Sequence, residues 1–273
     1  DWSSDVCSSD LTNIFYPEPL TLTLSDPMIL PALSAAPLEW LGVHPVVVYN
    51  LLLIAAFWLS GVATYLLAER LTGSARAAFL AGLVFALYAY RFEHYSHLEL
   101  QMTQWIPLGL LALHFFVATG CWWHAIALAG AGVAQLYSSM YYGVFLLLYA
   151  TVIGVGLLIV HRAEVRRLVM PTLLAGAVAA IVALPLFRAF TAAEPAKGGG
   201  RTVGIVEQFS ARPIDYLRVN RYSMWSSQLL PPLGERALFP GFAPLALAAI
   251  GVAPPLSRSE EHTSELQSRF GIS

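Results

Sequence analysis

The densest group of side chains able to do chemistry lies in residues 91–101, a polar segment between two long apolar runs. On one helix, residues three and four positions apart are neighbours, so four polar side chains would share one broad face. These are Arg91, His94, His97 and Gln101. A guanidinium and imidazoles at a membrane surface suit a phosphate-bearing ligand. The pattern is also typical of an interfacial helix with one solvated face, so both interpretations stay open.

The histidines of this segment raise a further possibility, a metal site. His94 and His97 are three residues apart, and Glu93 or Glu99 could complete a set of ligands. Two histidines at this spacing are a weak signal by themselves. A need for a divalent cation is therefore left open by the sequence.

A single carboxylate in an unusual setting lies nearer the start of the chain. Asp26 directly precedes Pro27, and a residue before proline is biased away from helical geometry. In the simpler interpretation, Asp26 or Ser25 caps a helix that begins near Met28. In the functional interpretation, Asp26 is a general base or a metal ligand at the membrane face.

Hydroxyl groups gather in a third place, the short turn at residues 137–142. The hydroxyls of Tyr141 and Tyr142 could hydrogen-bond a sugar or a phosphate. Paired tyrosines at a membrane surface also serve as anchors, so this turn is a candidate part of a binding site rather than a motif.

The two ends of the chain read differently from the rest. Residues 258–268, RSEEHTSELQS, match the translation of a common short-read sequencing adapter, and residues 1–11 match its reverse complement. We therefore expect residues 1–11 and 258–273 to be adapter-encoded. Residues 12–257 are then expected to be a fragment of a membrane domain cut from a longer gene.

Setting these ends aside changes the charge balance. Two of the 15 basic residues and six of the 17 acidic residues lie in them, so the formal net charge moves from −2 to +2. This small charge predicts no nucleic-acid partner. Cys121 is the cysteine that remains, which excludes an internal disulfide and a zinc site built on several cysteines.

The composition is that of a membrane protein, with 57% apolar residues, 12% charged residues and a mean hydropathy of +0.64. A membrane-spanning helix needs about 20 apolar residues. Six segments approach this, 45–67, 75–90, 105–119, 122–136, 141–160 and 169–187, and 239–256 is a seventh candidate. We predict an all-α, polytopic transmembrane helix bundle of about six to seven spans. Its expected partner is the lipid bilayer that surrounds it.

Small residues and charges add detail to this bundle. Two pairs of small residues at a spacing of four suit close contacts between helices: Ala78 with Gly82, and Gly130 with Ala134.

Arginines concentrate in the short loops 68–76 and 161–168, and such loops are retained in the cytoplasm. The loops 12–44, 91–104 and 188–240 are then extracytoplasmic. The turn 137–140 falls on the same side. Most of the polar residues without an obvious structural role therefore lie on one side of the membrane, and the longest loop is expected to be solvated.

The order and spacing of these residues resemble those of bacterial integral-membrane glycosyltransferases of the GT-C superfamily. The resemblance rests on 13–17 (NIFYP), 25–26 (SD), 49–51 (YNL), 90–91 (YR), 97–98 (HL), 104–107 (QWIP) and 138–142 (SSMYY). It implies a multi-pass protein of the bacterial plasma membrane. It also implies transfer of a sugar from a polyprenyl-phosphate donor to an acceptor on the extracytoplasmic face.

The resemblance also implies roles for single residues. In such enzymes an acidic residue of the first extracytoplasmic loop acts as base or metal ligand, and Asp26 is the matching residue here. Basic residues hold the lipid phosphate, for which Arg91 and His97 are the candidates, while Tyr142 would shape the sugar site. Similar proteins tend to have glutamine where this chain has Glu99. They also carry an acid upstream of residue 12.

Two other functions remain as alternatives. A transporter or flippase of lipid-linked glycans should carry ionisable residues near the middle of the bilayer, whereas the predicted spans contain no carboxylate. A non-catalytic membrane assembly factor would use the long loop 188–240 as its interaction surface. The absence of midplane carboxylates favours the enzyme.

Overall fold

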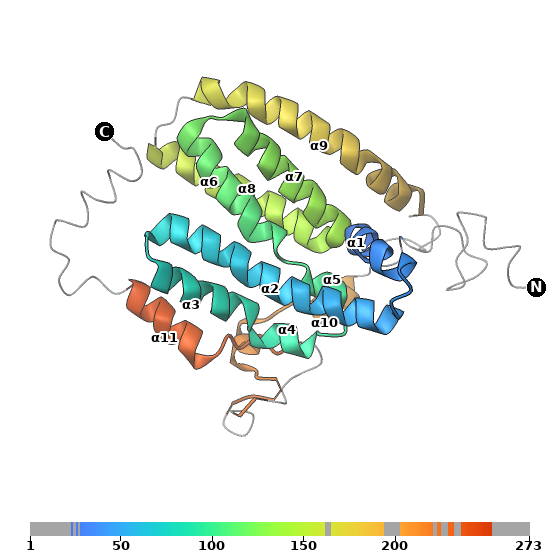
Figure 1. Cartoon of the computed structure of the whole chain (residues 1–273). Helices are drawn as coiled ribbons and strands as arrows, with labels where there is room; N and C mark the ends of the chain where they lie inside the picture. Colours follow the sequence, from blue (N-terminus) through green and yellow to red (C-terminus); the bar gives the residue numbers. More distant parts are fainter. Residues whose placement is uncertain are drawn as a thin grey trace, which may run out of the picture.

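The computed structural model describes residues 23, 26, 28–161, 165–193, 203–220, 223–224, 229–231 and 236–252. Within these ranges the chain forms helices joined by turns, and the one extended pairing is an isolated parallel bridge between Arg218 and Leu230. Figure 1 shows the helices packed side by side as a bundle. The predicted all-α fold class is confirmed.

Five segments of the described chain are long and apolar enough to cross a membrane. They are α2 (Pro45–Thr72), α3 (Ala75–Ala86) continued by α4 (Ala89–Glu93), α5 (Leu98–Gln101) continued by α6 (Trp105–Thr119), α8 (Met140–His161) and α9 (Val165–Ala193). A sixth predicted span lies on α7 (Trp122–Ser138), which has 17 residues and packs against α6, α8 and α9. The chain is therefore a multi-pass membrane protein.

The seventh predicted span, 239–256, is only partly a helix in the described chain. It contains α11 (Phe242–Val252), an apolar helix of 11 residues that is too short to cross a bilayer alone. Residues 253–256 lie outside the described part.

The boundaries of α2 and α3 follow from local chemistry. α2 begins with Pro45, whose missing N–H is harmless in a first turn, and His44 Nδ1 accepts a hydrogen bond from the Val46 N–H at 3.3 Å. α2 ends at Gly73, which has a φ of 66° that glycine tolerates best. Ser74 then caps α3 by accepting from the Ala77 N–H.

Small side chains allow α2 and α3 to approach closely, as predicted for Ala78 and Gly82. Ala78 has no exposed surface, and a Cβ added to Gly82 would lie 2.6 Å from the Gly61 carbonyl oxygen. The other predicted pair behaves differently. A Cβ on Gly130 would meet nothing within 4 Å, because Gly130 and Ala134 line a cavity between α7 and α9.

The arginines of the two short loops lie at the same end of the bundle. The Arg70 guanidinium stacks over Phe115, 4.7 Å from the ring centre, near the end of α6. Arg167 donates a hydrogen bond to the Thr119 carbonyl, also at the end of α6. The opposite end carries α1 (Ile29–Trp40), which packs on α2 and α7 (Figure 1). The two arginine-bearing loops and α1 therefore lie at opposite ends of the bundle.

Candidate functional site

Arg91 is the central cation of the polar segment and is buried, with 5% of its surface exposed. Its Nε donates to Gln101 Oε1 at 3.1 Å, and its Nη2 donates to the Gln101 carbonyl at 2.8 Å. The guanidinium also lies over the Phe57 ring, 4.3 Å from its centre. α2 and α5 together therefore fix the position of this charge.

Gln101 has no exposed surface and stabilises the backbone of the polar segment. Its Nε2 donates to the carbonyls of Arg91, at 3.2 Å, and His94, at 2.8 Å. The single helix assumed for residues 91–101 is wrong, because α4 ends at Glu93 and α5 begins at Leu98. The chain folds back between them, and Arg91 meets Gln101 through this turn rather than along a helix face.

Arg91 has unused capacity to bind an anion. Its Nη1 is buried and has no hydrogen-bond partner among the described residues. No carboxylate of the described chain lies within 4 Å of the guanidinium. A buried charge is unfavourable unless it is paired and hydrogen-bonded, so the site favours an anionic ligand next to Nη1.

Asp26 is bound to the turn between α7 and α8. Its Oδ2 accepts from Ser139 Oγ at 2.8 Å, and its Oδ1 accepts from the Met140 N–H at 3.0 Å. Asp26 therefore caps the start of α8, 114 positions away from it in the sequence. Asp26 does not form the predicted cap on the helix after Pro27, because the N-cap of α1 is Met28 and the Asp26 carboxylate bonds to Ser139 and Met140 instead. Ser25, the other predicted cap, lies outside the described residues.

The environment of Asp26 makes its carboxylate more basic. Burial raises the pKa of Asp26 above its ordinary value of 3.8, and the nearby charge of Glu99 raises it further. The hydrogen bonds from Ser139 and Met140 lower the pKa, but the raising effects are larger. A carboxylate that is held in place and made more basic has two properties of a general base.

Glu99 and His97 form a pair near this carboxylate. His97 Nδ1 lies 3.1 Å from Glu99 Oε1, and the side chains are 51% and 20% exposed respectively. His94 is different, because it is buried, stacks on Tyr90 at 4.0 Å and places Nδ1 3.0 Å from the Tyr90 carbonyl. The environment of His94 is thus that of a packed aromatic side chain.

The candidate metal site has no complete ligand set in the described residues. The rings of His94 and His97 lie 6.2 Å apart and tilted by 46°. No group of three or more His, Cys, Asp or Glu side chains in the described chain is arranged to hold a metal ion.

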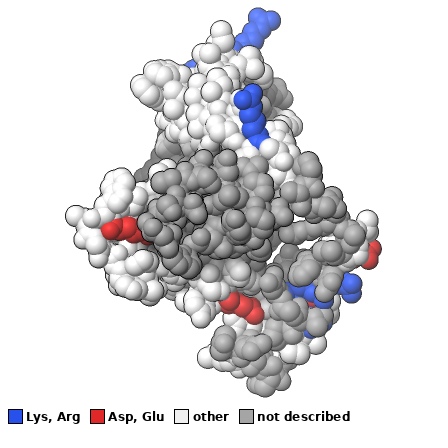
Figure 2. Space-filling model, turned by 90° about the vertical axis from the view of Figure 1, so that its right-hand side faces the viewer, with Lys and Arg blue, Asp and Glu red and all other residues white. Residues whose placement is uncertain are grey.

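Tyr141 and Tyr142, at the start of α8, differ in their exposure. Tyr142 is partly buried on α8, close enough to Arg91 and Glu99 to interact with their charges. Tyr141 is 57% exposed. The structure thus brings Asp26, Arg91, Glu99 and Tyr142 into one region at the end of the bundle that carries α1. Figure 2 faces that end, where a few acidic side chains are visible among the described residues.

One ordered part of the long loop was missed in the sequence. Asp215 is buried and accepts hydrogen bonds at 2.9 Å from the Arg212 N–H and from Arg218 Nε, while Arg236 Nη1 lies 3.9 Å away. Its backbone carbonyl accepts from the Leu238 N–H. Tyr88 joins this structure to the bundle by donating to the Leu238 carbonyl at 3.2 Å. The part of the loop around Asp215 is therefore folded rather than simply solvated.

This folded loop should depend on pH through Asp215. The hydrogen bond from the Arg212 N–H, followed by Arg218 and Arg236, lowers the pKa of Asp215 below 3.8, although burial opposes the shift. A lowered pKa stabilises the fold above pH 3.8, and this stabilisation is lost as the pH falls through the folded-state pKa. We expect Asp215→Asn to speed hydrogen exchange of the Leu238 and Phe239 amides severalfold at neutral pH. Unchanged exchange would contradict the role of Asp215.

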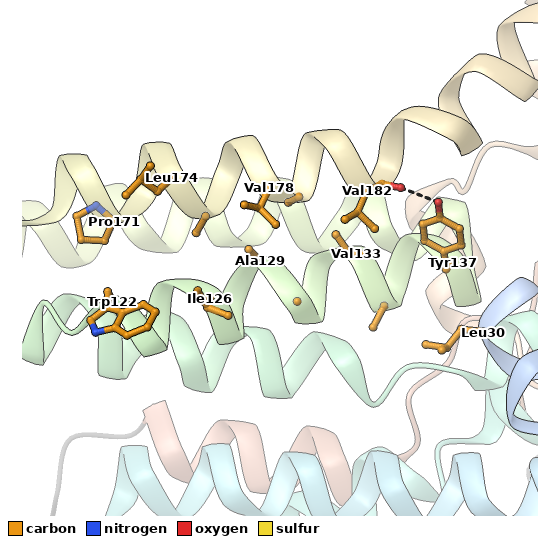
Figure 3. A pocket seen from close by; sticks show the side chains of 14 residues that line it. Leu30, Trp122, Ile126, Ala129, Val133, Tyr137, Pro171, Leu174, Val178 and Val182 are labelled. Atoms are coloured by element: carbon orange, nitrogen blue, oxygen red, sulfur yellow. Dashed lines mark hydrogen bonds between the residues drawn. The ribbon is translucent and has the colours of Figure 1, made fainter.

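An apolar cavity of about 530 Å³ lies between α7 and α9 (Figure 3). It extends from Trp122 to Leu30 and Tyr137, and Tyr137 crosses it to donate to the Val182 carbonyl at 2.7 Å. A second apolar cavity, of about 430 Å³, opens beside it among α6, α7, α8 and α9. Tyr137 precedes Ser138 and Ser139, so one end of the first cavity lies close to Asp26.

A protein-family model described as a domain of unknown function, DUF6311, matches residues 2–245. The match begins within residues 1–11, so the adapter origin of that segment stays a prediction. No curated protein and no solved structure matches the chain significantly.

Proposed function

The chain belongs to the DUF6311 family, and from its own residues we propose that it is an integral-membrane glycosyltransferase. It moves a sugar from a polyprenyl-phosphate donor to an acceptor hydroxyl on the extracytoplasmic face of the bacterial plasma membrane. The proposal requires a site for a phosphate, a base for the acceptor and room for a lipid chain. Each has a candidate at the α1 end of the bundle.

The buried guanidinium of Arg91 carries the proposal. It has one donor group without a partner in the described chain and no described carboxylate beside it. Sugar transfer releases the lipid phosphate with an additional negative charge. A fixed cation that faces this charge stabilises the transition state more than the ground state. The proposal assigns this role to Arg91.

Asp26 is the proposed base. As the acceptor oxygen attacks the anomeric carbon, its proton passes to the Asp26 carboxylate. The bond from the anomeric carbon to the phosphate oxygen breaks, and the lipid phosphate leaves with the bonding electrons. Ser139 and Met140 hold the carboxylate in place. Any divalent cation would add charge stabilisation, and Asp26 and Glu99 are the carboxylates near enough to take part.

The apolar cavities beside α9 are the proposed place for the polyprenyl chain. Ala129, Val133, Ala175 and Ala179 line both cavities, and the end near Tyr137 approaches Asp26. An isoprenoid chain gains stability from each apolar group that it buries. A lipid chain lying there would bring its phosphate toward the same end of the bundle as Arg91.

Filling these cavities gives a test that leaves the polar site intact. We expect Ala179→Trp to raise the KM for a long-chain polyprenyl donor by roughly tenfold or more, because the chain loses apolar contacts. A donor with a very short chain should be used as well as by the wild type. Ala177→Trp is the matched control, since Ala177 is exposed and lines neither cavity. Equal effects on both donors would contradict this placement.

Transport of the lipid-linked sugar is the second candidate function, because Arg91 is an ionisable residue within an apolar spanning segment. Reconstitution separates the two. In proteoliposomes supplied with a radiolabelled polyprenyl-phosphate sugar and a mixture of cell-envelope acceptors, a transferase produces free polyprenyl phosphate. A flippase moves the intact donor between the leaflets, and that result would overturn the proposed function.

A further inference from the structure

The turn between α4 and α5 has a rigid backbone but an open surface. Tyr49 of α2 donates a hydrogen bond to the Ser96 carbonyl at 2.9 Å and a longer one, of 3.4 Å, to the Tyr95 carbonyl. Gln101 holds the His94 carbonyl from the other side. The two ends of the turn are therefore tied to buried or partly buried side chains, and this limits its motion.

Two ring side chains of this turn are exposed. Tyr95 is 60% exposed, and the His97 side chain is 51% exposed. An exposed aromatic ring on a backbone that is already ordered loses little further entropy when a ligand binds to it. The turn is thus a preorganised surface.

Glu99 determines how His97 can interact with a ligand. A carboxylate accepts hydrogen bonds, so the contact of 3.1 Å requires Nδ1 of His97 to carry the proton toward Glu99 Oε1. In the neutral ring, Nε2 is then an acceptor. The Glu99 carboxylate, in contact with the same ring, is a second hydrogen-bond acceptor.

This pair suits hydroxyl groups better than phosphate. The charge of Glu99 offsets that of a protonated His97 and leaves the pair negative when His97 is neutral. A phosphate would be repelled, whereas sugar hydroxyls can donate to both acceptors. A ring such as that of Tyr95 can also pack against the apolar face of a sugar.

We propose that Tyr95, His97 and Glu99 form the acceptor subsite, and that the acceptor is a sugar with hydroxyl groups on adjacent carbons. The inference rests on the proposed function. Glu99 is close enough to Asp26 for their charges to interact, so a sugar on this surface lies beside the proposed base. Arg91 binds the donor phosphate on the buried side, and His97 serves the acceptor instead of the phosphate.

The test uses the protein in lipid nanodiscs and two probes, methyl α-glucoside and its 3-deoxy analogue, which lacks adjacent hydroxyl groups. Binding is measured by saturation-transfer NMR. We expect the glucoside to bind more tightly than the analogue. Tyr95→Ala should weaken its binding roughly threefold to tenfold, and Glu99→Ala roughly tenfold.

Trp123→Ala is the control, because Trp123 is also 60% exposed but lies at the opposite end of the bundle. Its glucoside binding should equal that of the wild type. Equal binding of both probes, or wild-type binding by Tyr95→Ala and Glu99→Ala, would overturn the subsite. Cleavage of the polyprenyl-phosphate sugar by the wild type is measured in parallel, with a mixture of cell-envelope acceptors present. If the wild type cleaves the donor but the probes fail this test, the subsite alone is wrong, and if the wild type never cleaves the donor, the proposed function is wrong.

Discussion

Asp26→Asn is expected to lower the rate of sugar transfer by roughly 10²- to 10⁴-fold, the range for loss of a general base. The substitution preserves the local structure, because the amide oxygen can still accept from the Met140 N–H and the amide group can donate to Ser139 Oγ. The protein should therefore remain folded and bind its donor with an unchanged KM. The measurement is single-turnover transfer from a radiolabelled donor.

Two further variants serve as comparisons: one removes a hydrogen bond to Asp26, and the other removes a different carboxylate. Ser139→Ala removes one hydrogen bond to Asp26 but leaves the base, so we expect a loss of less than about tenfold. Glu39→Gln removes an exposed carboxylate of α1 and should transfer sugar at the wild-type rate. Wild-type activity in Asp26→Asn would show that Asp26 is not the catalytic base.

Arg91→Ala is expected to reduce turnover by roughly 10²- to 10³-fold, because the leaving phosphate loses its fixed cation. The loss should appear mainly in kcat, since the charge on the phosphate grows as its bond to the sugar breaks. The substitution also leaves Gln101 Oε1 without its donor, which would lower stability by about 1–3 kcal/mol. Thermal unfolding must therefore be measured beside turnover.

Arg91→Gln separates the loss of the positive charge from the loss of the hydrogen bonds to Gln101. Its amide can still hydrogen-bond Gln101, so we expect a smaller loss of stability than in Arg91→Ala but the same loss of turnover. Arg188→Ala removes an exposed arginine near the C-terminal end of α9 and should behave as the wild type. An Arg91→Gln variant with normal kcat would show that the charge is not used in catalysis.

The membrane fold could be predicted because apolar runs and their flanking residues act locally. Pro45, Gly73 and Ser74 mark their helix boundaries through backbone chemistry that needs no distant partner. The contact at Ala78 and Gly82 was also visible, since small residues four apart present a smooth face. The predicted contact at Gly130 and Ala134 was not found there, because spacing does not reveal whether a partner helix covers that face.

The site could be predicted only in part, since its key contacts join distant residues. Asp26 reaches Ser139 across 113 positions, and no local pattern indicates this pairing. The turn at 94–97 contains no glycine or proline, so the break between α4 and α5 left no signal in the sequence. Asp215 and Arg218 have a helical spacing that could have been noticed. The burial of Asp215 also depends on Leu238 and Arg236, which come later in the chain.

Cleavage of the donor is the most direct test of the proposed activity. The protein in proteoliposomes is given a polyprenyl-phosphate sugar and acceptor, and mass spectrometry follows both the free polyprenyl phosphate and the glycosylated acceptor. We expect the wild type to form the two products in equal amounts, and Asp26→Asn and Arg91→Gln to form almost none. Recovery of the donor intact with the wild type, whether or not it has crossed the membrane, would contradict the assignment of this protein as a glycosyltransferase.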